Sequence, residues 1–136
     1  MSPCRRYLHR VAALAVLTLA GCDIHDERVG YSSEGPSIAN MPPQKPDLTA
    51  YTHFLGSKVS RNFLADSGTS AACAVAAGCV AALRTRASRK GIPPAALFQA
   101  LKDSALKVVP TPGWDPGYGY GIIRPVAAAR ALGLIP

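Results

Sequence analysis

The sequence predicts an α/β fold in which short strands precede a long buried helix and two further helices follow it. Three observations lead to this prediction. An unbroken run of apolar residues and glycines from Ala71 to Leu83 has no polar stripe, and a helix of this kind must be buried. Short β-rich segments come before this run, and helical patterns come after it. Glycine and proline number twelve each, which suits a loop-rich α/β protein better than a helical bundle.

The segments before the long helix are predicted as short strands joined by loops. Residues 16–24 read as a buried strand bounded by acidic residues, and residues 29–33 read as a short strand before a Gly-Pro turn. Residues 37–45 contain two consecutive prolines and are predicted to form a loop. Residues 48–51 are short and extended, and residues 56–64 are predicted to form a hairpin arm.

Three helices are predicted in the second half of the chain. The long helix covers about residues 69–89, and Gly91 is a suitable residue to end it. Pro94 fits the first turn of the next helix, whose core positions repeat at four-residue spacing as Leu97, Leu101 and Ala105. A last helix covers about residues 125–132, and the arginine before it cannot accept capping hydrogen bonds from its first N–H groups.

The composition restricts the class of protein. An apolar content of 49 % and a charged content of 17 % argue against disorder, and 136 residues fit one domain of ordinary size. Part of the net charge of +7 lies at the end of the long helix, where cations interact favourably with the helix dipole: Arg84, Arg86, Arg89 and Lys90. Because no basic face is interleaved with aromatic residues, no nucleic-acid partner is predicted.

The cysteines do not indicate a metal site. They are Cys4, Cys22, Cys73 and Cys79, and none of them forms a CxxC pair, so zinc is not expected. Cys73 and Cys79 point to different sides of one helix and cannot bridge each other. Both are predicted to be small buried residues, with a reactive thiol at Cys73 as the alternative. No cofactor is expected, and no carboxylate cluster has the spacing of a calcium loop.

Ser70 is the candidate catalytic residue. It follows Gly68 and Thr69 at the start of the long helix, where backbone N–H groups are unpaired and the helix dipole is positive. A hydroxyl at that position can serve as a nucleophile, while the same turn stabilises a developing oxyanion. The alternative is that Ser70 only caps the helix, as serine often does.

Four segments resemble the subtilisin-like serine peptidases, or subtilases. Residues 66–78, Asp-Ser-Gly-Thr-Ser-Ala-Ala-Cys-Ala-Val-Ala-Ala-Gly, resemble their nucleophile segment and match it at Gly68, Thr69, Ser70, Ala72, Ala77 and Gly78. Residues 31–36 resemble their Ser-Ser-x-Gly-Pro segment, and residues 117–121 resemble their closing Gly-x-Gly turn. Residues 45–50 resemble their Lys-Pro-Asp-Ile-x-Ala segment, although Tyr51-Thr52 follows here in place of the usual Pro-Gly.

The resemblance implies a partial subtilisin-like α/β fold, with parallel-sheet strands before the helix that carries the nucleophile. It covers the C-terminal part of the family's catalytic domain. The implied function is a serine endopeptidase that attacks peptide or protein substrates through Ser70. In the family, the Asp and His of the triad come far upstream of the serine, and those motifs are missing here. The chain is therefore expected to be inactive alone and to need the missing N-terminal half as a partner.

The histidines of the chain do not replace the missing base. Asp47, His53 and Ser70 stand in the family's order, but Thr-His-Phe lacks the family's His-Gly-Thr context, and its place matches a substrate-side loop. His9 lies in the N-terminal basic segment, and His25 lies beside a surface turn, where solvent exposure is expected.

The N-terminal segment has two interpretations. Residues 1–22 have the layout of a lipoprotein signal, in which basic residues and an apolar run end at the lipobox-like Leu19-Ala20-Gly21-Cys22. The same residues, from 16 onward, also fit the family's strand before Ser-Ser-x-Gly-Pro, and cleavage before Cys22 would remove that strand. Residues 23–136 are assigned to the C-terminal part of a subtilase catalytic domain in either case.

Two alternatives to a protease follow from these features. The chain could be an exported lipoprotein that uses a degenerate, non-catalytic protease scaffold for binding, with a membrane partner only if Cys22 is lipidated. It could also be a decayed fragment that does not fold, since half of a sheet leaves an unpaired edge. Because relatives of this family are usually secreted, an extracytoplasmic location is expected.

Overall fold

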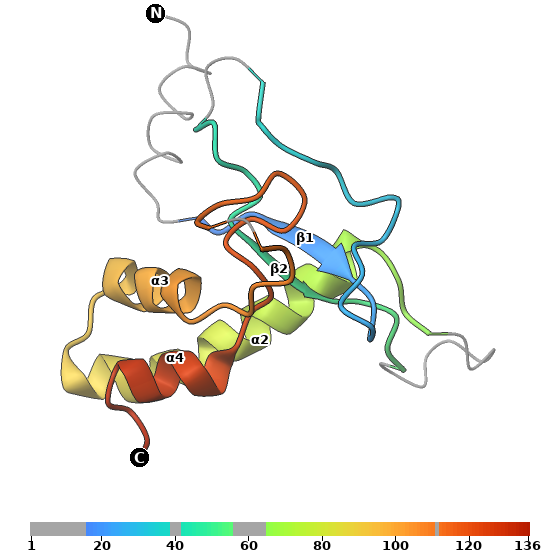
Figure 1. Cartoon of the computed structure of the whole chain (residues 1–136). Coiled ribbons are helices and arrows are strands. Elements are labelled where there is room, and N and C mark those ends of the chain that lie inside the picture. Colours follow the sequence, from blue (N-terminus) through green and yellow to red (C-terminus); the bar gives the residue numbers. More distant parts are fainter. Residues whose placement is uncertain (1–15, 39–41, 56–64, 111) are drawn as a thin grey trace, which may run out of the picture.

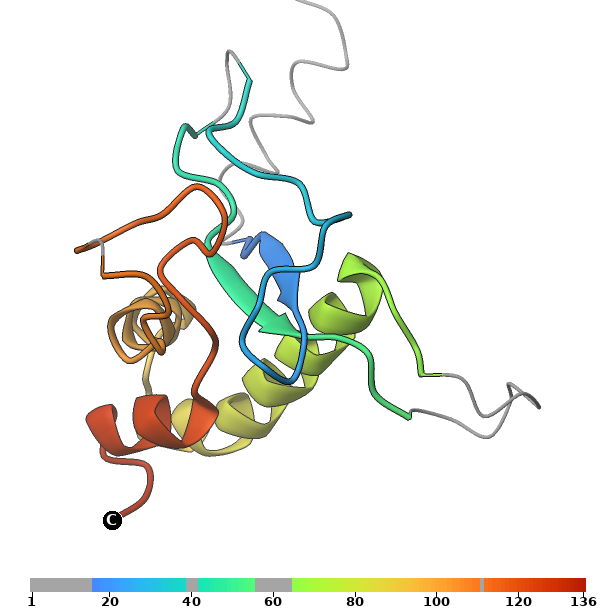
Figure 2. The same cartoon turned by 45° about the vertical axis from the view of Figure 1, so that its right-hand side comes forward.

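The computed structural model describes residues 16–38, 42–55, 65–110 and 112–136. The element order is β1 (Leu19–Cys22), β2 (Leu48–Tyr51), α2 (Thr69–Ala87), the short 3₁₀ helix η1 (Ser88–Lys90), α3 (Pro94–Asp103) and α4 (Pro125–Ala131). Helix α2 packs against both strands, and α4 contacts α2 and α3 (Figure 1). Figure 2 shows the N-terminal turn of α2 at the side of the molecule away from α3 and α4.

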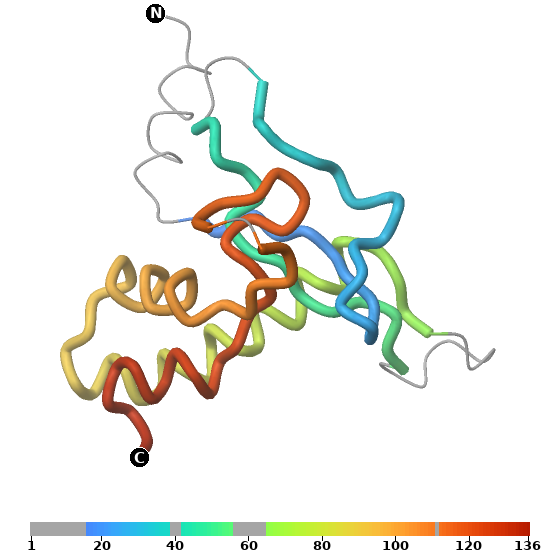
Figure 3. Tube along the Cα trace, in the orientation of Figure 1, coloured from blue at the N-terminus to red at the C-terminus, as the bar shows by residue number. Residues whose placement is uncertain are grey.

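The two strands form a small parallel sheet. Leu19 lies opposite Leu48, and Cys22 lies opposite Tyr51. On the other edge of β2, Thr49 forms a parallel bridge with Ile122, through hydrogen bonds to Gly121 and Ile123 of 2.9 Å each. The backbone trace in Figure 3 shows this late segment running beside β2. The described residues therefore form the mixed α/β partial fold that the sequence predicted.

The strand predictions hold for β2 and need correction elsewhere. The predicted strand over 16–24 is shorter, because the Asp23 carboxylate accepts the His25 and Glu27 N–H groups and turns the chain directly after Cys22. The predicted strand over 29–33 is absent from the described residues. Val29 instead donates one hydrogen bond to Gly21, so this segment folds back over the end of β1. The predicted hairpin arm over 56–64 lies outside the described residues.

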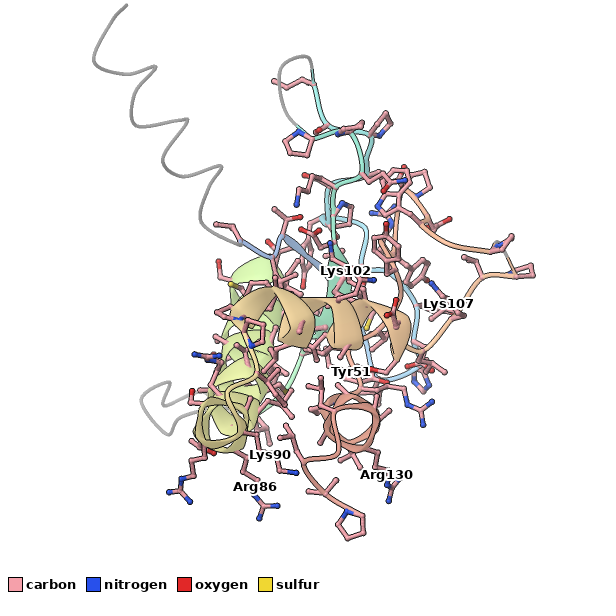
Figure 4. All side chains as sticks on the ribbon, turned by 90° about the vertical axis from the view of Figure 1, so that its left-hand side faces the viewer. Tyr51, Arg86, Lys90, Lys102, Lys107 and Arg130 are labelled. Carbon is pink, nitrogen blue, oxygen red and sulfur yellow. The ribbon has the colours of Figure 1, made fainter. Side chains whose placement is uncertain are left out.

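Helix α2 begins and ends close to the predicted residues. Alanine, the strongest helix former, supplies much of its length. The last predicted turn tightens into η1, and the left-handed Gly91, with a φ of 69°, ends it as expected. Arg84 and Arg86 donate to the backbone oxygens of Ile92 and Leu134, both at 3.2 Å. Figure 4 shows Arg86, Lys90 and Arg130 around this end of the molecule.

Only one face of α2 is buried. This face packs against the sheet and α4 and consists of Ala72, Ala76, Leu83 and Ala87. The opposite face, which we call the open face, is exposed over Cys73, Ala74, Ala77, Gly78 and Ala81. The prediction of a helix buried on all sides is therefore correct for half of its circumference. No element among the described residues covers the rest, and for this reason Cys73 is exposed and Cys79 is half-buried instead of both being buried.

The other two helices complete the core as predicted. Pro94 starts α3, and Leu97, Leu101 and Ala105 are all buried. Helix α4 starts at Pro125 with no side-chain cap from Arg124, in agreement with the prediction. No helix in the described part of the chain combines the length and the hydropathy that crossing a membrane requires.

A buried carboxylate ties the sheet to α3. Asp47, directly before β2, accepts hydrogen bonds from the backbone and hydroxyl of Thr18 at 2.8 Å and from Lys102 of α3 at 2.7 Å, and it also pairs with Lys45. Burial opposes ionisation of Asp47, but the hydrogen bonds from Lys102, Lys45 and Thr18 outweigh it and lower its pKa to about 2. Figure 4 labels Lys102 on α3.

Candidate active site

Ser70 is the second residue of α2 and is exposed to solvent. Gly68, not Ser70, occupies the N-cap position, and the cap makes no side-chain hydrogen bond. Among the described residues, no group is hydrogen-bonded to the Ser70 hydroxyl. The Ser70 side chain therefore does not cap α2 in this structure.

The first turn of α2 leaves donors open beside this hydroxyl. Ala71 and Ala72 donate to the Gly68 oxygen at 3.1 and 3.4 Å, and the Gly68 N–H donates to the Tyr31 hydroxyl at 2.8 Å. The N–H groups of Thr69 and Ser70 have no acceptor among the described residues. The first turn also contains no acidic side chain that would neutralise the dipole. The positive end of α2 is thus open to an anion at Ser70.

Gly68 is required by the backbone that leads into this turn. Its φ of 99° and ψ of 155° lie in a region that residues with a Cβ rarely adopt. This conformation turns the chain abruptly into α2 and places Ser70 at the exposed tip. The glycine of the Gly-Thr-Ser motif therefore has a direct geometric role.

Two segments far from Ser70 in sequence lie against the same turn. The Thr52 hydroxyl at the end of β2 donates to the Gly68 oxygen at 3.2 Å, while Tyr31 follows β1 in the chain. The ring of His53 lies 6.0 Å from that of Tyr31, centroid to centroid, with the planes tilted by 37°. The sequence did not predict roles for Tyr31 and Thr52. The only signal was the replacement of the family's usual glycine by Thr52.

The described residues do not assemble a catalytic triad. Asp47 and His53 flank β2 on opposite ends, so an extended chain of roughly 3.3 Å per residue places them on the order of 15–20 Å apart. Asp47 is also fully engaged by Thr18 and two lysines. His25 is exposed in the turn after β1, as predicted, and His9 lies outside the described residues. Asp47 therefore cannot orient His53 as a base for Ser70.

Of the thiols, Cys73 is exposed about one helical turn after Ser70 on α2, where a reactive thiol remains the alternative to a structural one. Cys22 is fully buried in β1, and burial, followed by the charges of Asp26 and Asp23, raises its pKa to about 12. Two surface hollows in the described part of the chain, one lined mainly by α2 and α4 and one mainly by the segment 122–127, do not include Ser70. Within the described ranges, no group of three His, Cys, Asp or Glu side chains could hold a metal ion.

Comparisons with known proteins agree with the resemblance. Residues 7–121 match the sequence profile of the subtilase family. Subtilisin-like protease SBT6.1 of Arabidopsis thaliana is 35 % identical over 113 residues, which make up 76 % of this chain and 11 % of that protein.

Solved structures show the same fold. The protease domain of PatA, solved as a mutant, matches with a TM-score of 0.67 at 22 % identity, over 88 % of this chain and 41 % of that one. The Clostridium perfringens CspB protease matches with a TM-score of 0.69 at 21 % identity, over 89 % of this chain and 27 % of that one. The chain thus spans less than half the length of these proteins. On the profile match and the identity to SBT6.1, the chain belongs to the subtilase family.

Proposed function

We propose that the chain is the nucleophile-bearing part of a serine endopeptidase and that Ser70 attacks the carbonyl carbon of a peptide bond. The observation that supports this most is the exposed Ser70 hydroxyl at the open N-terminus of α2. In the attack, the hydroxyl loses its proton to a base, and the carbonyl oxygen becomes an anion. The Ser70 N–H supplies one hydrogen bond to that anion in a region where the helix dipole also favours negative charge.

The base comes from outside the described residues in this proposal. A serine hydroxyl is a weak nucleophile without a histidine to accept its proton and an aspartate to orient that histidine. In subtilisin, loss of the base costs about as much as loss of the whole triad, roughly six orders of magnitude in turnover. An N-terminal part of a subtilase catalytic domain would supply both residues.

The open face of α2 is the surface that would receive such a part. Its apolar side chains and glycine have no cover among the described residues, although the buried face of the same helix is packed. The solved relatives that share the fold are more than twice as long as this chain, so they contain further structure beyond the matched region. Continuous exposed apolar surface of this kind is typical of an interaction site.

Reconstitution tests this function. The full chain is combined with the N-terminal part of a subtilase catalytic domain, which carries Asp and His, and hydrolysis of casein is measured. We expect hydrolysis only when both parts are present. Ser70→Ala should abolish it, whereas Ser67→Ala, a matched change at an exposed neighbour before the helix, should leave it intact. Hydrolysis that survives Ser70→Ala would contradict the assignment.

We also propose that residues from 16 onward are retained as a core strand. Cys22 is buried, and Leu19 to Cys22 pair with β2, so cleavage before Cys22 would expose the edge of β2. The location outside the cytoplasm expected for the family is compatible with cleavage before residue 16. Mass spectrometry of the native protein measures its N-terminus. An acylated N-terminal Cys22 would overturn this proposal.

A further inference from the structure

Hydrogen bonds hold Gly68, which precedes Thr69 and Ser70, on both sides of its backbone. The Gly68 N–H donates to the Tyr31 hydroxyl at 2.8 Å, and the Gly68 oxygen accepts from the Thr52 hydroxyl at 3.2 Å. Tyr31 and Thr52 come from separate segments, one after β1 and one at the end of β2. We call this arrangement the Gly68 clamp.

Both halves of the clamp are anchored to β1. The backbone N–H of Thr52 donates to the Cys22 oxygen at 2.8 Å, and Thr52 is only 1 % exposed. Beside Tyr31, the buried Ser32 hydroxyl accepts from the Gly21 N–H at 3.2 Å. The clamp therefore transmits the position of the sheet to the first turn of α2. Tyr31 itself is 52 % exposed, so the Thr52 half is the more strongly fixed.

The orientation of the Gly68 peptide determines where the unpaired N–H groups of Thr69 and Ser70 point. Its oxygen accepts from Ala71 and Ala72, so the peptide plane of Gly68 is the starting point of the helix. Glycine has no side chain that restrains it at a φ of 99°, and the restraint must come from neighbours. A displacement of about 1 Å in a reacting group can cost about a hundredfold in rate.

We infer that Tyr31 and Thr52 are positioning residues, which hold Gly68 so that the Ser70 hydroxyl and N–H face the substrate carbonyl. This inference rests on the proposed function for its catalytic consequence. Its structural part does not depend on activity. Thr52 stands where the family segment that residues 45–50 resemble is usually followed by Pro-Gly, and a glycine there could not donate this hydrogen bond.

Hydrogen exchange of the full chain tests the structural part. Thr52→Val removes the hydroxyl and keeps the shape, and we expect exchange at the Ala71 and Ala72 amides to become about tenfold faster, as the loss of one buried hydrogen bond implies. Thr49→Val is the matched control, because Thr49 is equally buried on β2 but donates to Tyr118 instead. Thr49→Val should leave the exchange rates of the Ala71 and Ala72 amides unchanged.

Two further variants keep the test decisive. Thr52→Ser retains the hydroxyl and should restore slow exchange at Ala71. Tyr31→Phe removes the other half of the clamp and should accelerate exchange at the Gly68 amide, whereas Tyr118→Phe, which removes the acceptor of the Arg28 N–H, should not. If Thr52→Val does not fold, the tyrosine pair decides the outcome. Unchanged exchange at Ala71 and Gly68, or equal acceleration by the control variants, would overturn the clamp.

The catalytic consequence has its own readout in the reconstituted protease. Thr52→Val should lower kcat about tenfold or more with little change in KM, and Thr52→Ser should restore kcat. A mere loss of stability would not give this separation of kcat from KM when the enzyme is assayed well below its unfolding temperature. If wild-type chain never cleaves casein, the proposed function fails, while the exchange result still decides the clamp. Rapid cleavage by Thr52→Val with kcat unchanged would contradict the positioning role.

Discussion

The two faces of α2 are made of similar small apolar residues but have different surroundings. Ala72 and Ala76 on one face lie against the strands and are buried. Ala74, Ala77 and Gly78 on the other face are exposed, and Ser70 lies at the N-terminal end of the same exposed side. The identity of the side chains therefore does not decide burial along this helix. The elements that the chain brings to each face decide it.

This difference separates the packed core of the described residues from the surface that receives a partner in the proposed function. The buried face, with Leu48 of β2 and Leu97 and Leu101 of α3, belongs to one continuous core. The open face is chemically suited to burial but is exposed in this chain. Because this face adjoins Ser70, the proposed function places the docking surface and the catalytic site next to each other.

The largest expected effect comes from placing a charge on each face in turn. Ala76→Glu buries an unpaired carboxylate at a position that is 3 % exposed, and we expect it to lower the free energy of unfolding by more than about 3 kcal/mol. Ala77→Glu is the matched change one residue later on the open face and should alter it by less than about 0.5 kcal/mol. Urea denaturation of the full chain measures both.

The same pair separates folding from assembly. In the reconstituted protease, Ala77→Glu should abolish casein hydrolysis although the isolated variant is folded, because the charge would be buried against the added part. Equal destabilisation by both variants would show that the open face is already covered. Undiminished hydrolysis by Ala77→Glu would show that the added part docks elsewhere.

The carboxylate that ties β2 to α3 gives an intermediate, pH-dependent effect. The pKa of Asp47 is lowered to about 2, so its stabilising contribution is fully present above the ordinary value of 3.8 and is lost as the pH falls through 2. Relative to Asp47→Asn, wild type should lose about 2 kcal/mol of unfolding free energy between pH 4 and pH 2. Urea denaturation at a series of pH values measures it. A constant difference between the two proteins would contradict the buried ion cluster.

A comparison that needs no substitution is the alkylation rate of the exposed Cys73 against that of the buried Cys22. Cys73 is exposed on the open face, whereas Cys22 is buried in β1 with a pKa of about 12, so only about one Cys22 thiol in 10,000 is ionised at pH 8. Iodoacetamide should alkylate Cys73 at least about a hundredfold faster than Cys22, as followed by peptide mass spectrometry. Comparable rates would mean that β1 is not paired with β2 in solution.

The sequence predicted elements whose signals are local. The alanine-rich composition located α2, and Gly91 and Pro94 located the end of one helix and the start of the next. Residues 48–51, predicted to be short and extended, form β2 with the same bounds. The signal for the position of Ser70 was also local, because Gly68 turns the chain directly into α2.

The features that sequence reasoning missed depend on contacts between distant segments. The end of β1 is set by hydrogen bonds to the Asp23 side chain, and the predicted strand over 29–33 was lost because Val29 pairs with the end of β1 instead. Burial of α2 was overestimated because apolar character indicates suitability for burial, not the presence of a covering element. The Gly68 clamp joins residues up to 37 positions apart, and no periodicity reveals it.

In the proposed function, the Ser70 hydroxyl becomes a nucleophile at the open end of α2 once a base is supplied. A fluorophosphonate probe, applied to the full chain with and without the part that carries Asp and His, measures this directly when the labelled peptide is sequenced by mass spectrometry. We expect a covalent adduct on Ser70 that forms only with both parts present. A properly assembled complex in which Ser70 stays unlabelled, or in which another hydroxyl carries the adduct, would contradict it.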